Sequence, residues 1–453
     1  MKTNRRFFGL LPASKVFATT ICIMLCIFAC SCQKKTDTTK IEQTAAISFT
    51  DDEGNQIALQ KPCERIISLY SAHTENLFEL GSGEKIIGAS NTSIYPPSAA
   101  FIERFDYKGD PEEIIAAEPD VVLIRPFITN KSPDFVSALK NAGITVVSLY
   151  PESFDDFDDY IEKLGLIVGE SDTAKQKLSQ FHSNIEEISK KTSKIENKKK
   201  LFFESTEVNL RTVTKSSLTG MAINFAGGIN IAENAKAVNP SSSIADFGIE
   251  NILSYANDID VYVSQRGAMN AGGNEHSISI RPAFDTIKAV KNGDIYLINE
   301  KIISSPTFRY YKGITELARF MYPDIMDTTE NMDKSALATK KDFAEIIVKM
   351  KHLPIYIPSS SKYYLNPPKG HVYGLFEDVE YNDDSFDYIE TAVNFGAIDF
   401  SENEDKEYFY PENKVTREQV ASAIFLLNNI DTENANATIG DIDKCKNANI
   451  VSA

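Results

Sequence analysis

Basic residues, cysteines and histidines are scarce in this chain of 453 residues, and tryptophan is absent. The 47 Lys and Arg residues are outnumbered by 64 Asp and Glu residues, which gives a net charge of −17. A nucleic-acid binder needs a basic surface to neutralise phosphates, so this balance argues against that class. The six cysteines include no CxxC pair in the folded region, which indicates neither a disulfide framework nor a zinc site.

The few histidines are also far apart. A bare-metal site needs several His and carboxylate ligands that converge on one ion. The candidates are scattered along the chain at His73, His182, His276, His352 and His371. The adjacent Glu112 and Glu113 do not face each other on a helix, so they do not form a catalytic carboxylate pair. We therefore expect no metal, no cofactor and no enzymatic activity.

An apolar run follows a positively charged start at the N-terminus. The run reads VFATTICIMLCIFA, which is short for a spanning helix of ~20 apolar residues. It ends in IFAC and ACSC, which resemble the lipobox of bacterial lipoproteins, where one Cys becomes lipidated. Cys30 and Cys32 both fit, and Cys30 is favoured because its −3 and −1 neighbours suit a lipobox. A plain secretory signal or an N-terminal anchor helix is the alternative.

The rest of the chain divides into segments that differ in composition and hydrophobic pattern. Its length allows two to four domains of ~100–200 residues. Short apolar strands alternate with amphipathic helices in two stretches, which is typical of an α/β fold with parallel sheets. A mostly unbroken helical pattern separates them, and the end of the chain is acidic and aromatic. We expect a signal peptide at 1–31, a tether at 32–45, an N-lobe at 46–153, an inter-lobe helix at 154–196, a C-lobe at 197–325 and a separate region at 326–453. The fold class is then α/β, with two Rossmann-like lobes joined by a long helix and a small, mainly α-helical C-terminal domain.

One pattern occurs in both lobes. Residues 109–124 read GDPEEIIAAEPDVVLI and residues 248–263 read GIENILSYANDIDVYV. Each predicts a helix led by an acid and followed by a buried strand. Carboxylates stabilise the positive N-terminal end of a helix, which by itself explains Glu112, Glu113 and Glu250. Repetition in both halves, however, favours a shared role.

Residues 46–323 resemble the substrate-binding proteins of ABC importers, in the class with a rigid inter-lobe helix that binds cobalamin, ferric siderophores or haem. The resemblance is carried by RIISLYSAHTENLFELGSGEKIIGAS, IGASNTSIYPPSA, GDPEEIIAAEPDVVLI, INFAGGINIAE, AFDTIKAVKNGDIYLIN and YYKGITELARFMYP. It implies a lipid-anchored, extracytoplasmic receptor that passes a metal chelate or corrinoid to a permease and its ATPase. In this family one exposed Glu on each lobe docks on permease arginines, which implies that role for Glu112 and Glu250.

The ligand of such a receptor lies between the lobes, at the carboxyl ends of the strands. Candidate wall residues follow strands, at Tyr70, Ser71, His73, Tyr95, Tyr107, Arg125, Phe127, Ser205, Thr206, Arg211, Arg266 and Arg309. The arginine forks suit carboxylate, phosphate or catecholate oxygens. Tyr107 falls where cobalamin-binding relatives carry a stacking aromatic, but those relatives also use several tryptophans, which this chain lacks. His73 is a candidate ligand for haem iron or corrin cobalt, although a loop histidine with local polar contacts is the simpler interpretation.

The segment 376–427 resembles an S-layer homology repeat. The matching positions are Phe376, Asp378, Val379, Gly396, Phe409, Pro411, Thr416 and Arg417. Residues 338–350 look like the tail of a preceding repeat, with Lys340 in the place of the arginine, and 439–453 look like the start of a following one. The resemblance implies binding to cell-wall polysaccharide through Arg417. The alternative function is therefore a wall-anchored surface protein, either structural or glycan-acting.

Overall fold

The computed structural model describes residues 47–239, 242–267, 270, 275–326, 338–351, 353, 355, 375–380, 383–398 and 408–428. These residues belong to one compact unit that begins at Ile47. The expected signal peptide and tether, with Cys30 and Cys32, lie outside the described residues, as does the repeat fragment at 439–453. Within the described ranges, no helix is both long enough and apolar enough to cross a membrane.

A hairpin opens the described chain. Strands β1 (Ile47–Thr50) and β2 (Gln56–Leu59) pair antiparallel, with Ile47 opposite Leu59. The turn uses Gly54 at φ 81°, a left-handed conformation that glycine adopts without steric cost. Asp51 holds the turn by accepting hydrogen bonds from the backbone N–H groups of Glu53 and Asn55.

The N-lobe is a five-stranded parallel sheet in the order β5-β4-β3-β6-β7. Its strands are β3 (Ile66–Ser68), β4 (Ile86–Ser90), β5 (Glu103–Phe105), β6 (Val121–Ile124) and β7 (Thr145–Ser148). The helices that connect them are α2 (Ser71–Glu79), α3 (Pro111–Ala116), α4 (Pro126–Lys131) and α5 (Pro133–Asn141). Every residue of β6 is buried, as expected for a central parallel strand with both faces covered. The strand order reverses between β3 and β6, which is the topological switch point of the sheet.

The C-lobe repeats this design around a four-stranded parallel sheet in the order β10-β8-β12-β13. Its strands are β8 (Lys200–Glu204), β10 (Ile229–Asn230), β12 (Val261–Arg266) and β13 (Ile295–Asn299). A small antiparallel pair, β9 (Thr212–Val213) with β11 (Ile244–Ala245), lies outside this sheet. The helices are α8 (Leu218–Phe225), α9 (Gly248–Ser254), α10 (Glu275–Ser279), α11 (Lys288–Asn292), α12 (Glu300–Ile303) and α13 (Tyr310–Met321).

The repeated sequence pattern forms the same unit in both lobes. Helix α3 leads to β6 and helix α9 leads to β12. The acid that precedes each strand has a structural role. Asp120 accepts hydrogen bonds from the backbone N–H groups of Glu64 and Arg65, and Asp260 accepts one from Lys200. Each carboxylate thus fastens the start of the neighbouring parallel strand, which explains why an Asp occurs at both positions.

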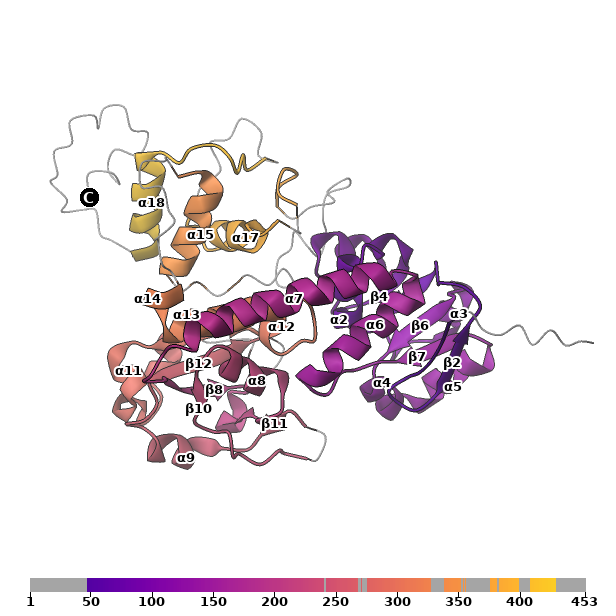
Figure 1. Ribbon diagram of the computed structural model, residues 1–453, viewed down its shortest axis with the longest axis horizontal. Coiled ribbons are helices and arrows are strands. Elements are labelled where there is room, and N and C mark those ends of the chain that lie inside the picture. Colours follow the sequence, from indigo (N-terminus) through magenta and orange to yellow (C-terminus); the bar gives the residue numbers. More distant parts are fainter. Residues whose placement is uncertain are drawn as a thin grey trace, which may run out of the picture. The chain divides into compact units, whose positions relative to one another are not determined.

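The link between the lobes is two helices, and the expectation of one mostly unbroken helix over 154–196 is wrong. Helix α6 (Phe157–Val168) ends at Gly169, which has φ 80°, and α7 (Ser171–Thr192) begins two residues later. The 22 residues of α7 are about 33 Å long at ~1.5 Å per residue. Helix α7 runs along both lobes (Figure 1). Its buried stripe, made of Ala174, Leu178, Phe181, Ile185 and Ile188, lies in the main core cluster.

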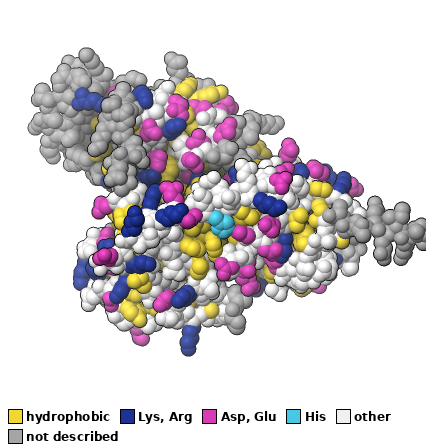
Figure 2. Space-filling view, viewed as in Figure 1, with side chains coloured by type: hydrophobic (Ala, Val, Ile, Leu, Met, Phe, Trp, Pro, Cys, Tyr) yellow, Lys and Arg dark blue, Asp and Glu magenta, His cyan; other side chains and the backbone are white. Residues whose placement is uncertain are grey.

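The regular elements described in the C-terminal part are helices, joined by turns and irregular segments. Helix α14 (Pro323–Met326) is followed by α15 (Lys340–Met350), α17 (Phe386–Asn394) and α18 (Arg417–Asn428). Helices α15 and α17 pack against each other, and Phe376 stacks near Phe409 in the buried core. The expected fold class, two parallel α/β lobes with a small helical C-terminal part, is confirmed. On the face drawn in Figure 2, acidic and basic side chains are interspersed over the described surface.

Candidate functional site

A cavity of about 560 Å³ lies where the carboxyl ends of the two parallel sheets approach each other. Loops that follow all five strands of the N-lobe line one wall, with Tyr70, Ser71, Asn91, Thr92, Asp106, Tyr107, Lys108, Arg125, Phe127 and Tyr150. The C-lobe contributes Ser243, Gln265, Glu300, Lys301, Ser304 and Ser305. The cavity is therefore an inter-lobe cleft, and its size is within the usual range of ~300–1,000 Å³ for small-molecule sites.

Arg125 is the central cation of the cleft. Its guanidinium carbon lies 4.6 Å from the centre of the Tyr70 ring and 4.8 Å from that of Phe127. Tyr70 follows β3 and Arg125 follows β6, so the two residues flank the switch point of the N-lobe sheet. Aromatic faces attract a guanidinium and hold it in place, and Arg125 also hydrogen-bonds the Tyr70 side chain. A guanidinium has five N–H donors, so others remain for another partner.

The C-lobe places a second cation in the same cleft. The Nζ atom of Lys301 lies 3.2 Å from the hydroxyl of Ser71 and donates to it across the lobes. Burial lowers the pKa of Lys301 from its ordinary value. Lys108 is exposed at the rim, while Asp106 and Glu300 supply two carboxylates. Three cations and two carboxylates leave the cleft with a small positive balance, although the chain as a whole is strongly acidic.

The structure brings together several of the residues predicted from sequence. Ser71, Tyr107, Arg125 and Phe127 line the cleft, together with Tyr70. Ser205 lines a smaller adjoining cavity of about 50 Å³, which shares Tyr150, Ser243, Gln265 and Ser304 with the cleft. All of these residues follow the carboxyl end of a parallel strand or lie opposite such an end. Ligands of open α/β sheets bind at this edge.

His73 does not line the cleft, and its expected loop position is wrong. It lies in helix α2, fully buried, with Nδ1 2.8 Å from the Tyr160 hydroxyl and Nε2 3.0 Å from the Ile124 carbonyl oxygen. A carbonyl only accepts, so Nε2 carries the proton and Nδ1 accepts from Tyr160. Burial lowers the pKa of His73 to about 4. Both nitrogens are occupied, so His73 is not available to an iron or cobalt atom.

Arg309 and Tyr95 do not line the cleft itself, but line a very small cavity of about 10 Å³ that shares Ser71, Thr92 and Lys301 with it. The buried Arg309 donates to both carboxylate oxygens of Glu75, at 2.7 and 2.8 Å, and its guanidinium carbon lies 3.5 Å from the centre of the Tyr95 ring. Glu75 belongs to the N-lobe and Arg309 to the C-lobe side. The pair therefore joins the lobes at the back of the cleft instead of facing a ligand.

The other two arginines have different environments. Arg211 is paired with Asp246 through Nε at 2.9 Å, near the surface of the C-lobe. Arg266 ends β12, and all three of its guanidinium nitrogens are buried without a hydrogen-bond partner among the described residues. Burial lowers the pKa of Arg266. Neither side chain lines the cleft described above.

The residues expected at interfaces lie on the surface. Glu112 is exposed in the first turn of α3, and Glu250 is exposed in the first turn of α9. Arg417 is exposed at the first residue of α18. The roles assigned to these positions from the sequence stay predictions.

Sequence reasoning missed several cleft residues. Tyr150 comes after β7, Lys108 after β5 and Lys301 after β13. The signal that identified Arg125, a polar or aromatic residue soon after a strand, was present at each of these positions. Gln265 was harder to identify, because it lies within β12 and only the register of the sheet turns it to the cleft.

Comparisons with known proteins agree with this geometry. The family model described as "Periplasmic binding protein" matches residues 66–302. An "Uncharacterized ABC transporter substrate-binding lipoprotein YvrC" from Bacillus subtilis is 27% identical over 280 residues, which cover 60% of this chain and 85% of that protein. A "Vitamin B12-binding protein" from Vibrio parahaemolyticus is 26% identical over 259 residues, which cover 57% and 89% respectively.

Solved structures show the same fold. A possible iron-binding, periplasmic solute-binding protein from Staphylococcus epidermidis superposes with a TM-score of 0.51 at 26% identity, covering 58% of this chain and all of that one. A periplasmic solute-binding protein from Veillonella parvula superposes with a TM-score of 0.52 at 20% identity, covering 67% and 98%. With the family match extending over more than half of its residues, the chain belongs to the periplasmic binding protein family.

Proposed function

We propose that this protein is the receptor of an ABC importer and captures an anionic metal chelate, such as a ferric siderophore or haem, or a cobalamin-type corrinoid. The observation that carries the proposal is Arg125, held between Tyr70 and Phe127 at the switch point of the N-lobe sheet. The guanidinium supplies a planar fork for carboxylate, phosphate or catecholate oxygens, and the rings supply apolar faces for a flat ligand.

The positive balance of the cleft favours an anionic ligand over a neutral one. Lys301 and Lys108 add to the charge of Arg125, and Lys301 reaches the cleft from the opposite lobe. A ligand that contacts both lobes is therefore met by cations on both sides. Relatives named for vitamin B12 binding and for iron binding support this range of ligands, and a relative named as an ABC transporter lipoprotein supports both the importer and a lipid anchor at Cys30 or Cys32.

Replacing Arg125 tests the proposal. We expect purified protein exposed to a ferric catecholate siderophore, hemin or cyanocobalamin to retain one of these chromophores. Arg125→Met should weaken retention of that probe about 10- to 100-fold, because a hydrogen bond to a charged group contributes roughly 1.5–3 kcal/mol. Absorption titrations measure the affinity.

Arg211→Met is the matched control, because Arg211 is paired with Asp246 outside the cleft. Its affinity should equal that of the unchanged protein. Retention of none of the three probes, or equal affinity in Arg125→Met and the unchanged protein, would contradict the proposal.

We also propose, separately, that the C-terminal region attaches to cell-wall polysaccharide through Arg417. Its support is the resemblance to S-layer homology repeats and the exposure of Arg417 at the start of α18. Co-sedimentation with purified wall material, compared between the unchanged chain and Arg417→Ala, tests it. Equal sedimentation of the two would exclude Arg417 from wall binding.

A further inference from the structure

A cluster of charged side chains, buried except for the partly exposed Lys312, joins three parts of the chain at the back of the inter-lobe cleft. Glu75 and Tyr95 come from the N-lobe, and Arg309 and Lys312 come from the segment that begins α13 on the C-lobe side. The fifth member is Asp387, in the first turn of α17 in the C-terminal part. The cluster thus contains two cations, two carboxylates and one aromatic ring.

The contacts within the cluster are direct. Arg309 donates to both oxygens of Glu75 and lies over the Tyr95 ring. The Nζ atom of Lys312 donates to an Asp387 oxygen at 2.8 Å. The first pair connects the N-lobe to the C-lobe, and the second connects the C-lobe to α17.

Helix α17 also contacts the N-lobe. The ring of Phe386 lies 6.3 Å from that of Tyr95, close to perpendicular, and Phe386 is 2% exposed. Nearby, Asn299 at the end of β13 donates to the backbone carbonyl of Ile355 at 3.4 Å. The C-terminal part therefore contacts both lobes beside the place where they meet.

Removal of one member of the cluster leaves another charge buried. Burial alone would raise the pKa of Asp387, but Lys312 and then Arg309 lower it below its usual value, so the carboxylate stays ionised. Breaking a buried pair by removing one partner is costly, because the remaining charge cannot be solvated. The cluster is therefore sensitive to single substitutions.

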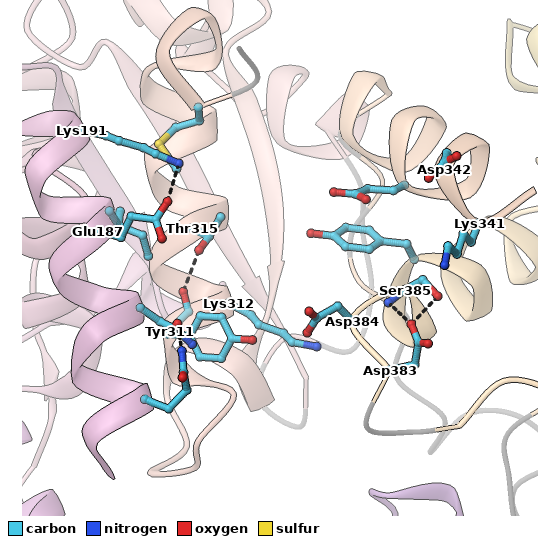
Figure 3. A pocket seen from close by; sticks show the side chains of 16 residues that line it. Glu187, Lys191, Tyr311, Lys312, Thr315, Lys341, Asp342, Asp383, Asp384 and Ser385 are labelled. Carbon is cyan, nitrogen blue, oxygen red and sulfur yellow. Dashed lines mark hydrogen bonds and ion pairs between the residues drawn. The ribbon is translucent and has the colours of Figure 1, made fainter. Parts of the chain in front are cut away.

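Other contacts also join the C-terminal part to the lobes, since Tyr388 of α17 hydrogen-bonds Arg319 of α13 and the buried apolar residues of α15 and α17 belong to the main core cluster. A groove of about 790 Å³ separates α7 and α13 from α15 and α17, and it is lined by polar side chains from both sides. Figure 3 shows Lys312 extending from α13 toward the turn that carries Asp383, Asp384 and Ser385. The cluster at the end of this groove is therefore one of the contacts that attach α17 to the lobes.

We propose that Asp387 and Phe386 are positioning residues, and that α17 is a third connection between the two lobes, beside helices α6 and α7, that helps to fix their relative position. The family match ends at residue 302, so α17 is an addition to the two-lobe receptor. By holding Lys312 and Tyr95 at once, α17 fixes the lobes that contain them. A change in α17 is then transmitted to helix α2, which carries Glu75 and begins at the cleft residue Ser71.

Hydrogen exchange of the whole protein without ligand tests this, so the result does not depend on what the cleft binds. Asp387→Asn should accelerate exchange roughly tenfold or more in two segments remote in sequence, α2 (71–79) and residues 304–310. Lys312→Met should accelerate exchange in α17 as well as in α2, because the coupling is reciprocal.

Asp378→Asn is the matched control. Asp378 accepts hydrogen bonds from the backbone N–H groups of Phe409 and Tyr410 within the C-terminal part. Its loss should accelerate exchange only in the two segments that it joins, residues 375–380 and 408–416, and should leave both α17 and α2 unchanged. If Asp387→Asn and Lys312→Met leave the exchange of α2 unchanged, the C-terminal part does not act on the contact between the two lobes, and the proposal is wrong.

Discussion

Four arginines predicted as ligand contacts occupy four different environments. Arg125 faces the cleft between two rings, Arg211 is paired at the surface, Arg266 is buried without a partner among the described residues, and Arg309 is buried against Glu75. A guanidinium lies at the end of a long flexible stem, so its position depends on neighbours that are distant in sequence. Sequence position therefore predicted that an arginine lines the cleft, but it did not predict which of the four arginines does so.

His73 gives a pH-dependent prediction at the same scale. Its pKa is about 4 in the folded protein and ~6.5 in an unfolded chain. Between these values the unfolded state binds more protons, so stability falls as pH decreases from 7 toward 4. This one group should lower the free energy of unfolding by roughly 2 kcal/mol between pH 7 and pH 5. Urea unfolding at the two pH values measures the difference.

His73→Gln is the comparison that isolates this group, because other groups also titrate in the same range. The variant is expected to be less stable at pH 7, since it loses the fit of the ring to Tyr160 and Ile124. Its loss of stability between pH 7 and pH 5 should nevertheless be smaller than that of the unchanged protein. An equal loss in both proteins would mean that His73 does not titrate as described.

At the scale of elements, the break between α6 and α7 is produced by one glycine and its surroundings. Gly169 has φ 80°, and a Cβ atom placed on it would lie 2.9 Å from Cγ of Pro62. A Cβ on Gly165 would lie 2.8 Å from that of Ala174, so the two helices approach closely just at the break. The helical periodicity of the sequence continues through Gly169, because one residue in the left-handed conformation does not change the spacing of apolar residues.

Substitution of this glycine should therefore destabilise the link between the lobes. Gly143 is a matched control, since it has φ 85° and no atom within 4 Å of an added Cβ. Gly143→Ala should cost about 1–2 kcal/mol, the price of a left-handed alanine. Gly169→Ala should cost about 1–3 kcal/mol more, because the side chain also meets Pro62. The midpoints of urea unfolding measure the difference in stability between the two variants. Equal midpoints would show that the contact with Pro62 relaxes without loss of stability.

At the scale of the whole molecule, the two repeated helices carry the proposed docking contacts. Glu112 and Glu250 are exposed, one on each lobe. Ion pairs at the rim of an interface guide encounter and orientation. Glu112→Ala and Glu250→Ala should each reduce transport of the ligand into cells or proteoliposomes at least about tenfold, while the affinity of the purified protein for that ligand stays within about twofold.

Glu113→Ala provides the control for this prediction. Glu113 is also exposed in the first turn of α3, next to Glu112 along the chain but turned by roughly 100° around the helix. Transport should be nearly unchanged in this variant. Loss of ligand affinity in Glu112→Ala, or equal transport defects in Glu112→Ala and Glu113→Ala, would contradict a specific docking role.

The sequence by itself determined the elements and the fold class of this protein, because hydrophobic periodicity and turn residues are local signals. The parallel lobes and the repeated helix and strand units both followed from such signals. Only the tertiary structure decided which side chains share the cleft, that His73 is a core residue, and that Arg309 meets Glu75 and lies near Asp387. These outcomes depend on burial and on contacts between segments more than two hundred residues apart, and in such contacts the cost of removing a charge from water selects the partner.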